Sequence, residues 1–207
     1  MKGAVSAVIL AAGESRRMGE PKLLLPLGGS TIIECTVRNV INSAVAEVVV
    51  VVGCEAEAIA ARLRGMPVRL VTNPHYREGM LTSALAGIGA VDLGAEAVML
   101  IPGDQPLIQT ATIDLVLAAF LQSEKGIAVP TYRGRKGHPI VFALKYRNEL
   151  LGFANDGVRR LLYDHPADVL RVAVDRTEVI SDIDTPSDYR ACASLFHSAG
   201  NKTESDC

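Results

Sequence analysis

The residues best suited to chemistry lie in the stretch Leu10–Lys22, which reads LAAGESRRMGEPK and follows the apolar run AVSAVI. It holds two glycines together with Arg16, Arg17 and Lys22. Glycines let backbone N–H groups approach an anion, while arginine and lysine supply charge to phosphate oxygens. The stretch therefore predicts a phosphate-binding loop. Its position directly after a predicted strand favours this over a solvated surface loop.

Two well-known phosphate-binding loops do not match this stretch. A dinucleotide-binding loop follows the pattern GxGxxG, but five residues separate Gly13 from Gly19. A Walker A loop places lysine directly after its second glycine, but Glu20 and Pro21 stand between Gly19 and Lys22. The count disfavours a dinucleotide-dependent oxidoreductase and leaves a longer, different phosphate loop.

Two acidic clusters are candidates for holding a divalent metal ion. Asp104 comes directly after the apolar run AVMLIPG, and Asp182 and Asp184 lie in the motif SDIDTPSDY. In an extended segment Asp182 and Asp184 would share one face. Two carboxylates from separate elements are enough to hold Mg²⁺ together with phosphate oxygens. The alternative is that such aspartates only cap turns and helices, which is the better explanation for Asp188.

No nucleophilic triad is evident among the serines and histidines. Ser15, Ser30 and Ser83 lack the pattern GxSxG, and the four histidines are scattered along the chain. The remaining chemistry is the positioning of phosphates and the neutralisation of their charge. This is what phosphoryl and nucleotidyl transfer need.

Alternating strands and helices must position these residues. Continuous Val, Ile and Leu runs suit strands covered on both faces, and they predict strands over residues 4–12, 47–53, 68–73, 97–104, 126–132, 139–143 and 169–174. Helical patterns fall at residues 31–43, 55–65, 82–91, 110–126 and 186–198. The alternation predicts a doubly wound α/β domain, and two strands close together around RGRKGH make its sheet mixed. Ligands in such folds bind beyond the carboxyl ends of the strands, which is where the glycine-rich loop and GDQPL are expected.

The composition limits the classes of function. The 207 residues fit one domain over residues 1–198 with a polar tail over 199–207, and the N-terminal apolar run is interpreted as a strand rather than a signal peptide. The net charge of −2 argues against broad nucleic-acid binding, and no apolar run is long enough to span a membrane. The cysteines show neither CxxC pairs nor zinc-ligand spacing, which predicts reduced thiols in a cytoplasmic protein: Cys35, Cys54, Cys192 and Cys207.

The stretch LAAGESRRMGEPKLLLPLGG resembles the signature of MobA-like nucleotidyltransferases, in the branch that contains molybdenum cofactor cytidylyltransferases. The motifs PHYREGMLTSALAGI, IPGDQPLI, KGHPIVF, NDGVRRLL and DIDTPSDY follow in the family's order, so the resemblance covers roughly residues 5–195. It implies a Rossmann-like, GT-A-like three-layer nucleotidyltransferase fold with a mostly parallel mixed sheet. It also implies Mg²⁺-dependent transfer of a nucleoside monophosphate from an NTP, with release of pyrophosphate.

The resemblance implies a set of residues around the nucleoside. The backbone at the end of the first strand would face the base: Leu10, Ala11, Ala12 and Gly13. A second segment would help to enclose base and ribose: Gly79, Met80 and Ser83. The guanylyl branch of the family has LAGG where this chain has LAAG, so CTP is the expected nucleotide, with GTP and ATP as alternatives. A methyl group at Ala12 would then exclude the larger purine.

The resemblance also implies the residues that act on the phosphates. Arg17 and Lys22 would hold the triphosphate and Asp104 would bind Mg²⁺, so these three are the expected catalytic residues. Asp184 is the expected second metal ligand, and Asp182 is the alternative.

The acceptor is expected at the motif RGRKGHPIVF. The family match at its centre favours an acceptor-binding role for Lys136, Gly137, His138 and Pro139. The alternative is a solvated hairpin turn. The motif NDGVRRLL departs from the family's usual Gly-Asp, because Ala154 and Asn155 precede Asp156, and this leaves the identity of the acceptor open. The alternative is that Asp156–Gly157 only starts a helix.

The partners implied by the resemblance are CTP and a molybdopterin-type acceptor carrying molybdenum, with hand-over to a molybdoenzyme or its chaperone, and without nucleic acid or membrane. Two other functions remain open. One is a nucleotidyltransferase for a sugar 1-phosphate or another phosphorylated acceptor. The other is a non-catalytic nucleotide- or cofactor-binding accessory protein for a molybdoenzyme, which the joint presence of the four charged site residues disfavours.

Overall fold

The protein is described by a computed structural model that covers residues 3–153 and 157–200. A mixed sheet is built from β1 (Val5–Ala11), β4 (Glu47–Val52), β5 (Arg69–Thr72), β6 (Ala97–Pro102), β7 (Ile127–Tyr132), β8 (Arg135–Lys136), β9 (Ile140–Ala143) and β10 (Val169–Ala173). Its order is β10-β7-β9-β6-β1-β4-β5, with β8 pairing on β7. Strands β5, β4, β1 and β6 are parallel, and β9 is antiparallel to both β6 and β7. The predicted mixed, mostly parallel sheet is confirmed.

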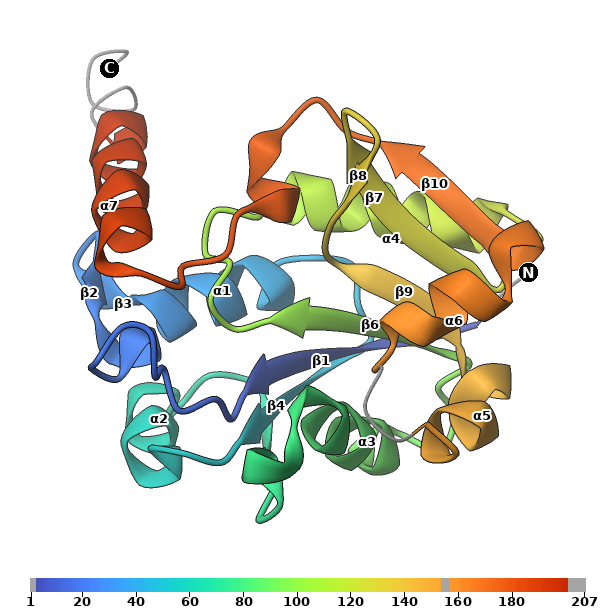
Figure 1. Cartoon of the computed structure of the whole chain (residues 1–207), viewed down its shortest axis with the longest axis horizontal. Helices are drawn as coiled ribbons and strands as arrows, with labels where there is room; N and C mark the ends of the chain where they lie inside the picture. Colours follow the sequence, from blue (N-terminus) through green and yellow to red (C-terminus); the bar gives the residue numbers. More distant parts are fainter. Residues whose placement is uncertain (1–2, 154–156, 201–207) are drawn as a thin grey trace.

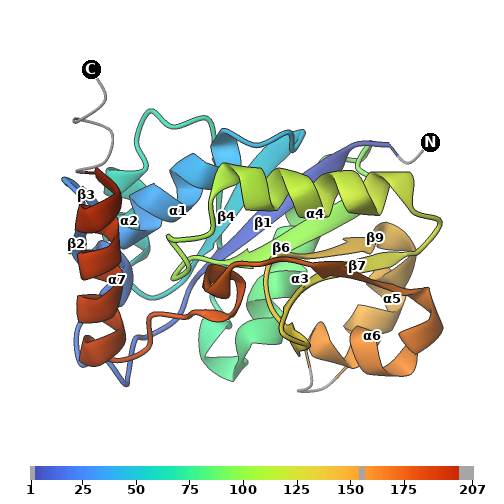
Figure 2. The same ribbon diagram turned by 90° about the horizontal axis from the view of Figure 1, so that it is seen from above.

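Helices cover both faces of the sheet, as Figure 2 shows. One layer contains α1 (Ile32–Ile41), α2 (Ala56–Arg62) and α4 (Thr110–Gln122), and the other contains α3 (Met80–Ala90), α5 (Arg147–Leu151) and α6 (Arg159–Asp164). The alternation along β1 explains the two layers. Ile9 packs in the core under α1 and α4, whereas its neighbour Val8 packs in the core with α3, α5 and α6. The three-layer α/β fold is therefore the observed one.

A separate hairpin and the last helix stand beside the sheet (Figure 1). The hairpin consists of β2 (Pro26–Leu27) and β3 (Ser30–Thr31), and α7 spans Pro186–Gly200. Helix α7 packs on the hairpin, because the Tyr189 hydroxyl donates to the Pro26 carbonyl at 2.7 Å and the Phe196 ring lies against Gly28. This helix extends two residues beyond the predicted end at residue 198.

Several boundaries differ from the prediction for local reasons. Helix α3 begins at Met80 rather than at residue 82, because Gly79 takes a φ of +122° and turns the chain directly into the helix. Helix α2 ends at Arg62 and α4 at Gln122, each a few residues before the predicted end. Helix α5 was not predicted, since five residues carry too little periodic pattern, whereas α6 follows closely on Gly157, in the motif where a helix start was the alternative. Residues 154–156 of the motif NDGVRRLL lie outside the described residues.

Short 3-10 helices connect the longer elements of the described chain, over Lys22–Leu24, Tyr76–Glu78, Leu144–Tyr146, Pro166–Asp168 and Thr177–Ile180. Within residues 3–153 and 157–200, no helix has both the length and the apolar character needed to cross a membrane.

Candidate active site

Strands β1 and β6 bring the glycine-rich loop and Asp104 to the same edge of the sheet. The two strands are parallel neighbours, with Leu10 opposite Pro102, and Figure 1 shows them ending side by side. The Gly103 amide donates to the Leu10 carbonyl at 2.8 Å, and a Cβ on Gly103 would lie only 2.9 Å from that oxygen. Glycine is therefore needed at position 103 for the two chain segments to meet.

Helix α1 holds the loop that carries Asp104. Thr36 Oγ1 donates to the Gly103 carbonyl at 2.9 Å, and Asn39 Nδ2 donates to the carbonyls of Pro106 and Ile108 at 3.0 and 2.9 Å. The sequence-based set missed both residues. The sequence pattern that could have identified them is a pair of polar side chains three positions apart on a helix face that is otherwise apolar and buried.

The segment Asp182–Asp184 docks on the same loop. The Ile183 amide donates to the Asp104 carbonyl at 3.2 Å, and Gln105 Nε2 donates to Asp182 Oδ1. Gln105 thereby holds Asp182 to one side, while Asp184 turns toward the glycine-rich loop. The structure thus separates the two aspartates that the sequence left as alternatives.

Four charged side chains meet where these segments converge. Lys22 Nζ contacts Asp104 Oδ2 and lies 3.0 Å from Asp184 Oδ1, and Arg17 NH1 lies 2.9 Å from Asp184 Oδ2. The side chains of Lys22 and Asp104 are 14% and 15% exposed, whereas Arg17 is 72% exposed. The four residues expected to act on the phosphates therefore form one cluster, anchored at a largely buried ion pair.

The cluster pairs two positive side chains with two carboxylates, and the carboxylate of Asp182 adds further negative charge beside it. Burial raises the pKa of Asp104; Lys22 opposes this rise, and the carboxylates of Asp182 and Asp184 add to it. Burial also disfavours the charged form of Lys22, but its two carboxylate partners outweigh this and raise its pKa. Burial is thus the main cause of the raised pKa of Asp104, whereas the carboxylate partners cause the raised pKa of Lys22. With Asp182 included, three carboxylates lie near two cationic side chains, which would attract a further cation.

The loop between β1 and Lys22 is held in its shape by Ser15. Ser15 takes a φ of +53°, its carbonyl accepts the amides of Met18 and Gly19 at 2.9 and 3.2 Å, and its Oγ accepts the Lys22 amide at 3.2 Å. A cavity of about 270 Å³ opens on one side of the loop, and its lining includes Gly13, Arg17, Lys22 and Asp184. A second cavity of about 400 Å³ lies between the loop and α2. The loop therefore has open volume for a ligand directly beside the charged cluster.

Of the residues expected to face the base, Ala11 and Ala12 are buried whereas Gly13 is exposed. The carbonyls of Leu10 and Ala12 accept the amides of Gly103 and Cys54, and Ala11 is buried in β1, so this segment also fastens β1 to its neighbours. The Ala12 side chain is 4% exposed and lies beside Gly53, where an added Cβ would be 2.9 Å from its own. Gly13 is exposed and lines both cavities.

The second nucleoside segment lies outside these cavities. Gly79 and Met80 are exposed at the start of α3, whereas Ser83 is buried and its Oγ accepts Asn73 Nδ2 at 2.9 Å. Arg77, two residues before Gly79, links this segment to the glycine-rich loop. The Glu14 carboxylate of that loop accepts hydrogen bonds from Arg16 at 2.7 Å and from Arg77 at 3.4 Å. The role of this segment in enclosing base and ribose stays a prediction.

The expected acceptor residues lie on the Asp182 side of the cluster. Gly137 packs so closely on the 3-10 helix Thr177–Ile180 that an added Cβ would lie 2.0 Å from the Val179 carbonyl oxygen, and the His138 amide donates to that oxygen at 2.8 Å. Burial lowers the pKa of His138 to about 4, and Arg159 adds to this while Asp182 opposes it. The imidazole is therefore neutral near pH 7. Pro139 is buried, and Lys136 is exposed on β8.

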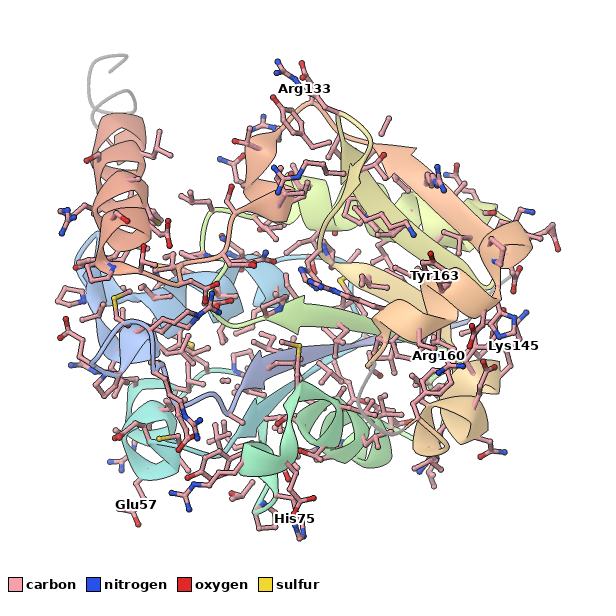
Figure 3. All side chains as sticks on the ribbon, viewed as in Figure 1. Glu57, His75, Arg133, Lys145, Arg160 and Tyr163 are labelled. Carbon is pink, nitrogen blue, oxygen red and sulfur yellow. The ribbon has the colours of Figure 1, made fainter. Side chains whose placement is uncertain are left out.

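The tip of the β7–β8 hairpin is a surface turn. Arg133 and Gly134 take φ angles of +47° and +79°, which is typical of a two-residue hairpin turn. Figure 3 shows Arg133 pointing outward from the tip of the hairpin. Its guanidinium stacks on the ring of Tyr132 at 5.2 Å. The tip of the hairpin is therefore a solvated turn, which is the alternative predicted for this motif. Gly137, His138 and Pro139 lie further toward the interior of the protein.

The residues present are compatible with a divalent metal ion that arrives with a phosphate ligand. Asp104 Oδ1 is buried and has no hydrogen-bond partner in the described part of the chain, which is costly for a carboxylate oxygen. Asp104 and Asp184 converge on one point, since both contact Lys22 Nζ. No group of three or more His, Cys, Asp or Glu residues among the described positions has the arrangement of a metal site. Mg²⁺ commonly uses only one or two carboxylates when substrate phosphates supply further oxygens.

The fold and the charged cluster define the class of an α/β nucleotidyltransferase, and comparisons with known proteins support the same class. A family model described as the MobA-like NTP transferase domain matches residues 7–169, so the chain belongs to the MobA-like NTP transferase family and is a nucleotidyltransferase. The molybdenum cofactor cytidylyltransferase of Escherichia coli (strain K12) is 30% identical over 90% of this chain and 94% of its own length.

Two solved structures are similar over nearly the whole chain. A nucleotidyl transferase from Methanothermobacter has a TM-score of 0.83 and 29% identity, covering 95% of this chain and 99% of its own. The protein Rv0371C of Mycobacterium tuberculosis H37Rv, solved in complex with manganese, has a TM-score of 0.80 and 27% identity, covering 93% of this chain and 99% of its own.

Proposed function

We propose that this nucleotidyltransferase transfers CMP from CTP to the terminal phosphate of molybdenum cofactor in a Mg²⁺-dependent reaction that releases pyrophosphate. The observation that carries the proposal is the cluster of Lys22, Arg17, Asp104 and Asp184 beside an open cavity at the carboxyl ends of β1 and β6. The choice of CTP and of this acceptor is supported by the similarity to the cytidylyltransferase of E. coli and by the LAAG form of the loop.

The reaction is an in-line displacement at the α-phosphorus of CTP. A terminal phosphate oxygen of the acceptor forms the new P–O bond, and the bond from the α-phosphorus to the bridging oxygen of the β-phosphate breaks, so that pyrophosphate leaves. A phosphate dianion is already a nucleophile, so no side chain needs to remove a proton. This is consistent with the neutral imidazole of His138 on the acceptor side.

The chain contributes binding, orientation and charge. Lys22 and Arg17 would leave their carboxylate partners and bind the triphosphate, where they offset the negative charge that develops on the departing pyrophosphate. Asp104 and Asp184 would hold Mg²⁺, which would supply positive charge to neutralise the reacting phosphates. Two observations support a divalent cation here: the related protein Rv0371C was solved in complex with manganese, and the buried Asp104 Oδ1 has no hydrogen-bond partner among the described residues while Asp182 adds negative charge nearby.

The acceptor would bind on the side of Asp182 and His138. Gly137 and Pro139 shape this side through the backbone, while His138 offers a neutral ring nitrogen and Lys136 a mobile positive charge. Lys136 would attract an anionic acceptor, and the hydrogen bond from Gln105 would offset part of the negative charge of Asp182 on this side.

The test is pyrophosphate release from each of the four NTPs, with and without molybdenum cofactor. CTP-specific release that depends on the cofactor is expected, and Asp104→Asn should abolish most of it. Release that needs a sugar 1-phosphate instead of the cofactor would show the alternative acceptor class. No release with any NTP and acceptor would contradict the proposed reaction.

A further inference from the structure

The carboxylates that would hold the metal ion are already engaged by side chains of the chain itself. Lys22 Nζ contacts Asp104 Oδ2 and Asp184 Oδ1, and Arg17 NH1 contacts Asp184 Oδ2. The fourth carboxylate oxygen of this pair, Asp104 Oδ1, has no hydrogen-bond partner within the described residues. A metal ion that bridged Asp104 and Asp184 would therefore have to share their oxygens with two cationic side chains.

Of the two cationic side chains, Lys22 would oppose the binding of a metal ion more strongly. Its nitrogen lies between the two carboxylates, and its side chain and that of Asp104 are about one-seventh exposed (14% and 15%), so water screens the charges poorly. A divalent cation placed beside this ammonium would be repelled strongly. Arg17 is 72% exposed and would be screened more effectively, so its effect is the smaller one.

The backbone at Lys22 is fixed while its side chain can swing. Ser15 Oγ accepts the Lys22 amide at 3.2 Å, and the next residue, Leu23, is buried in the core. A lysine head group is a mobile point charge on a flexible stem, so it can exchange one set of anionic oxygens for another without movement of the backbone. A triphosphate in the adjoining cavity supplies such oxygens, since Lys22 lines that cavity.

We propose that Lys22 keeps the Asp104–Asp184 pair closed to free divalent cations until a triphosphate withdraws its ammonium group. This inference rests on the proposed function of the site, because a triphosphate must bind Lys22. Metal and nucleotide then bind with positive coupling, although the nucleotide-free protein has low affinity for the metal. The coupling is reciprocal, so in the absence of metal the carboxylates compete with the triphosphate for Lys22 and Arg17.

The first test measures Mn²⁺ binding to the nucleotide-free protein by the electron paramagnetic resonance signal of the free ion. Lys22→Met removes the charge and keeps the length of the side chain, and it should bind Mn²⁺ about tenfold or more tightly than the unaltered protein. Adding Asp184→Asn to Lys22→Met should remove most of the gain. The matched control is Lys145→Met, which breaks a 2.8 Å pair with Asp168 elsewhere and should leave Mn²⁺ binding unchanged. Equal Mn²⁺ affinity of Lys22→Met and the unaltered protein overturns the inference.

The second test uses a variant that keeps Lys22 and measures CTP binding calorimetrically in EDTA and in Mg²⁺. Asp184→Asn should bind CTP several-fold more tightly than the unaltered protein in EDTA, and more weakly in Mg²⁺. If Lys22→Met does not fold, this inversion decides, and CTP binding that is no tighter in EDTA overturns the inference. Failure of the unaltered protein to bind any NTP would contradict the proposed function instead, while the Mn²⁺ measurement would still decide the role of Lys22.

Discussion

Lys22 and Asp104 are 82 positions apart in the chain, yet their side chains form an ion pair at the edge of the sheet where β1 and β6 end. The pair is largely buried, so removal of one partner leaves the other as an uncompensated charge. Asp184 extends the pair to a third segment of the chain, 162 positions from Lys22. Because these ion pairs join three distant segments of the chain, their residues are the first to test by mutagenesis.

Lys22→Ala should lower turnover by about 10²–10³-fold, because it removes one preorganised positive charge from the transferring phosphates. The measurement is pyrophosphate release at saturating CTP and acceptor. Lys145→Ala, which breaks an ion pair outside the site, should keep normal turnover. Near-normal turnover of Lys22→Ala would remove Lys22 from the mechanism.

Ala12→Gly should shift nucleotide preference toward GTP. The Ala12 methyl group is 4% exposed beside Gly53 and lines neither cavity, so its removal would act by letting the neighbouring backbone shift by about the size of one methyl group. A difference of this size changes discrimination by roughly tenfold. The quantity to measure is the ratio of kcat/KM for CTP to kcat/KM for GTP. An unchanged ratio would show that the methyl group does not select the base.

Gly137→Ala should destabilise the protein by about 1–3 kcal/mol, because the new Cβ would overlap the Val179 carbonyl oxygen at 2.0 Å. The displaced 3-10 helix Thr177–Ile180 leads directly into Asp182 and Asp184, so turnover should fall as well. Urea unfolding gives the change in free energy. Gly89→Ala is the matched control on α3, where an added Cβ meets no atom within 4 Å, and it should leave stability equal or higher. Equal stability of both variants would contradict the packing argument.

His138→Gln should make the protein less sensitive to acid. The pKa of His138 is about 4 in the folded protein and about 6.5 in an unfolded chain, so between these values the unfolded chain binds more protons. The contribution of His138 to the free energy of unfolding is therefore fully present above pH 6.5 and is lost as the pH falls toward 4. Between pH 7 and pH 4.5 the free energy of unfolding should fall by about 2 kcal/mol more for the unaltered protein than for His138→Gln, as measured by urea unfolding. Equal losses would show that His138 is not shielded from protonation.

Much of the fold follows from local patterns in the chain. The apolar runs of β1, β4 and β6 are continuous because both faces of these strands are covered, and a capping box of Thr31 and Glu34 begins α1. Helix α5 escaped prediction, since its stability comes from packing on the sheet rather than from its own short sequence.

The candidate site could be predicted only in part from the same kind of pattern. The loop residues Arg17 and Lys22 and the carboxylate Asp104 are predicted by residue type and by their place after strands. Thr36 and Asn39 were missed, because a polar residue on a helix shows its partner only when the opposing carbonyls are in place. Ser83 belongs to a segment expected near the nucleotide, but its hydroxyl group is buried against Asn73.

Periodicity and motif spacing are local properties of the chain, and they suffice to predict the α/β class, the mixed sheet, the family and the chemical types that gather at the carboxyl ends of the strands. The folded chain is needed to see that Lys22 lies between Asp104 and Asp184, and that Gln105 holds Asp182 instead. These pairings join segments far apart in the chain. They depend on which strands become neighbours in the sheet and on how buried charges and hydrogen-bonding groups find partners, and no local spacing encodes either.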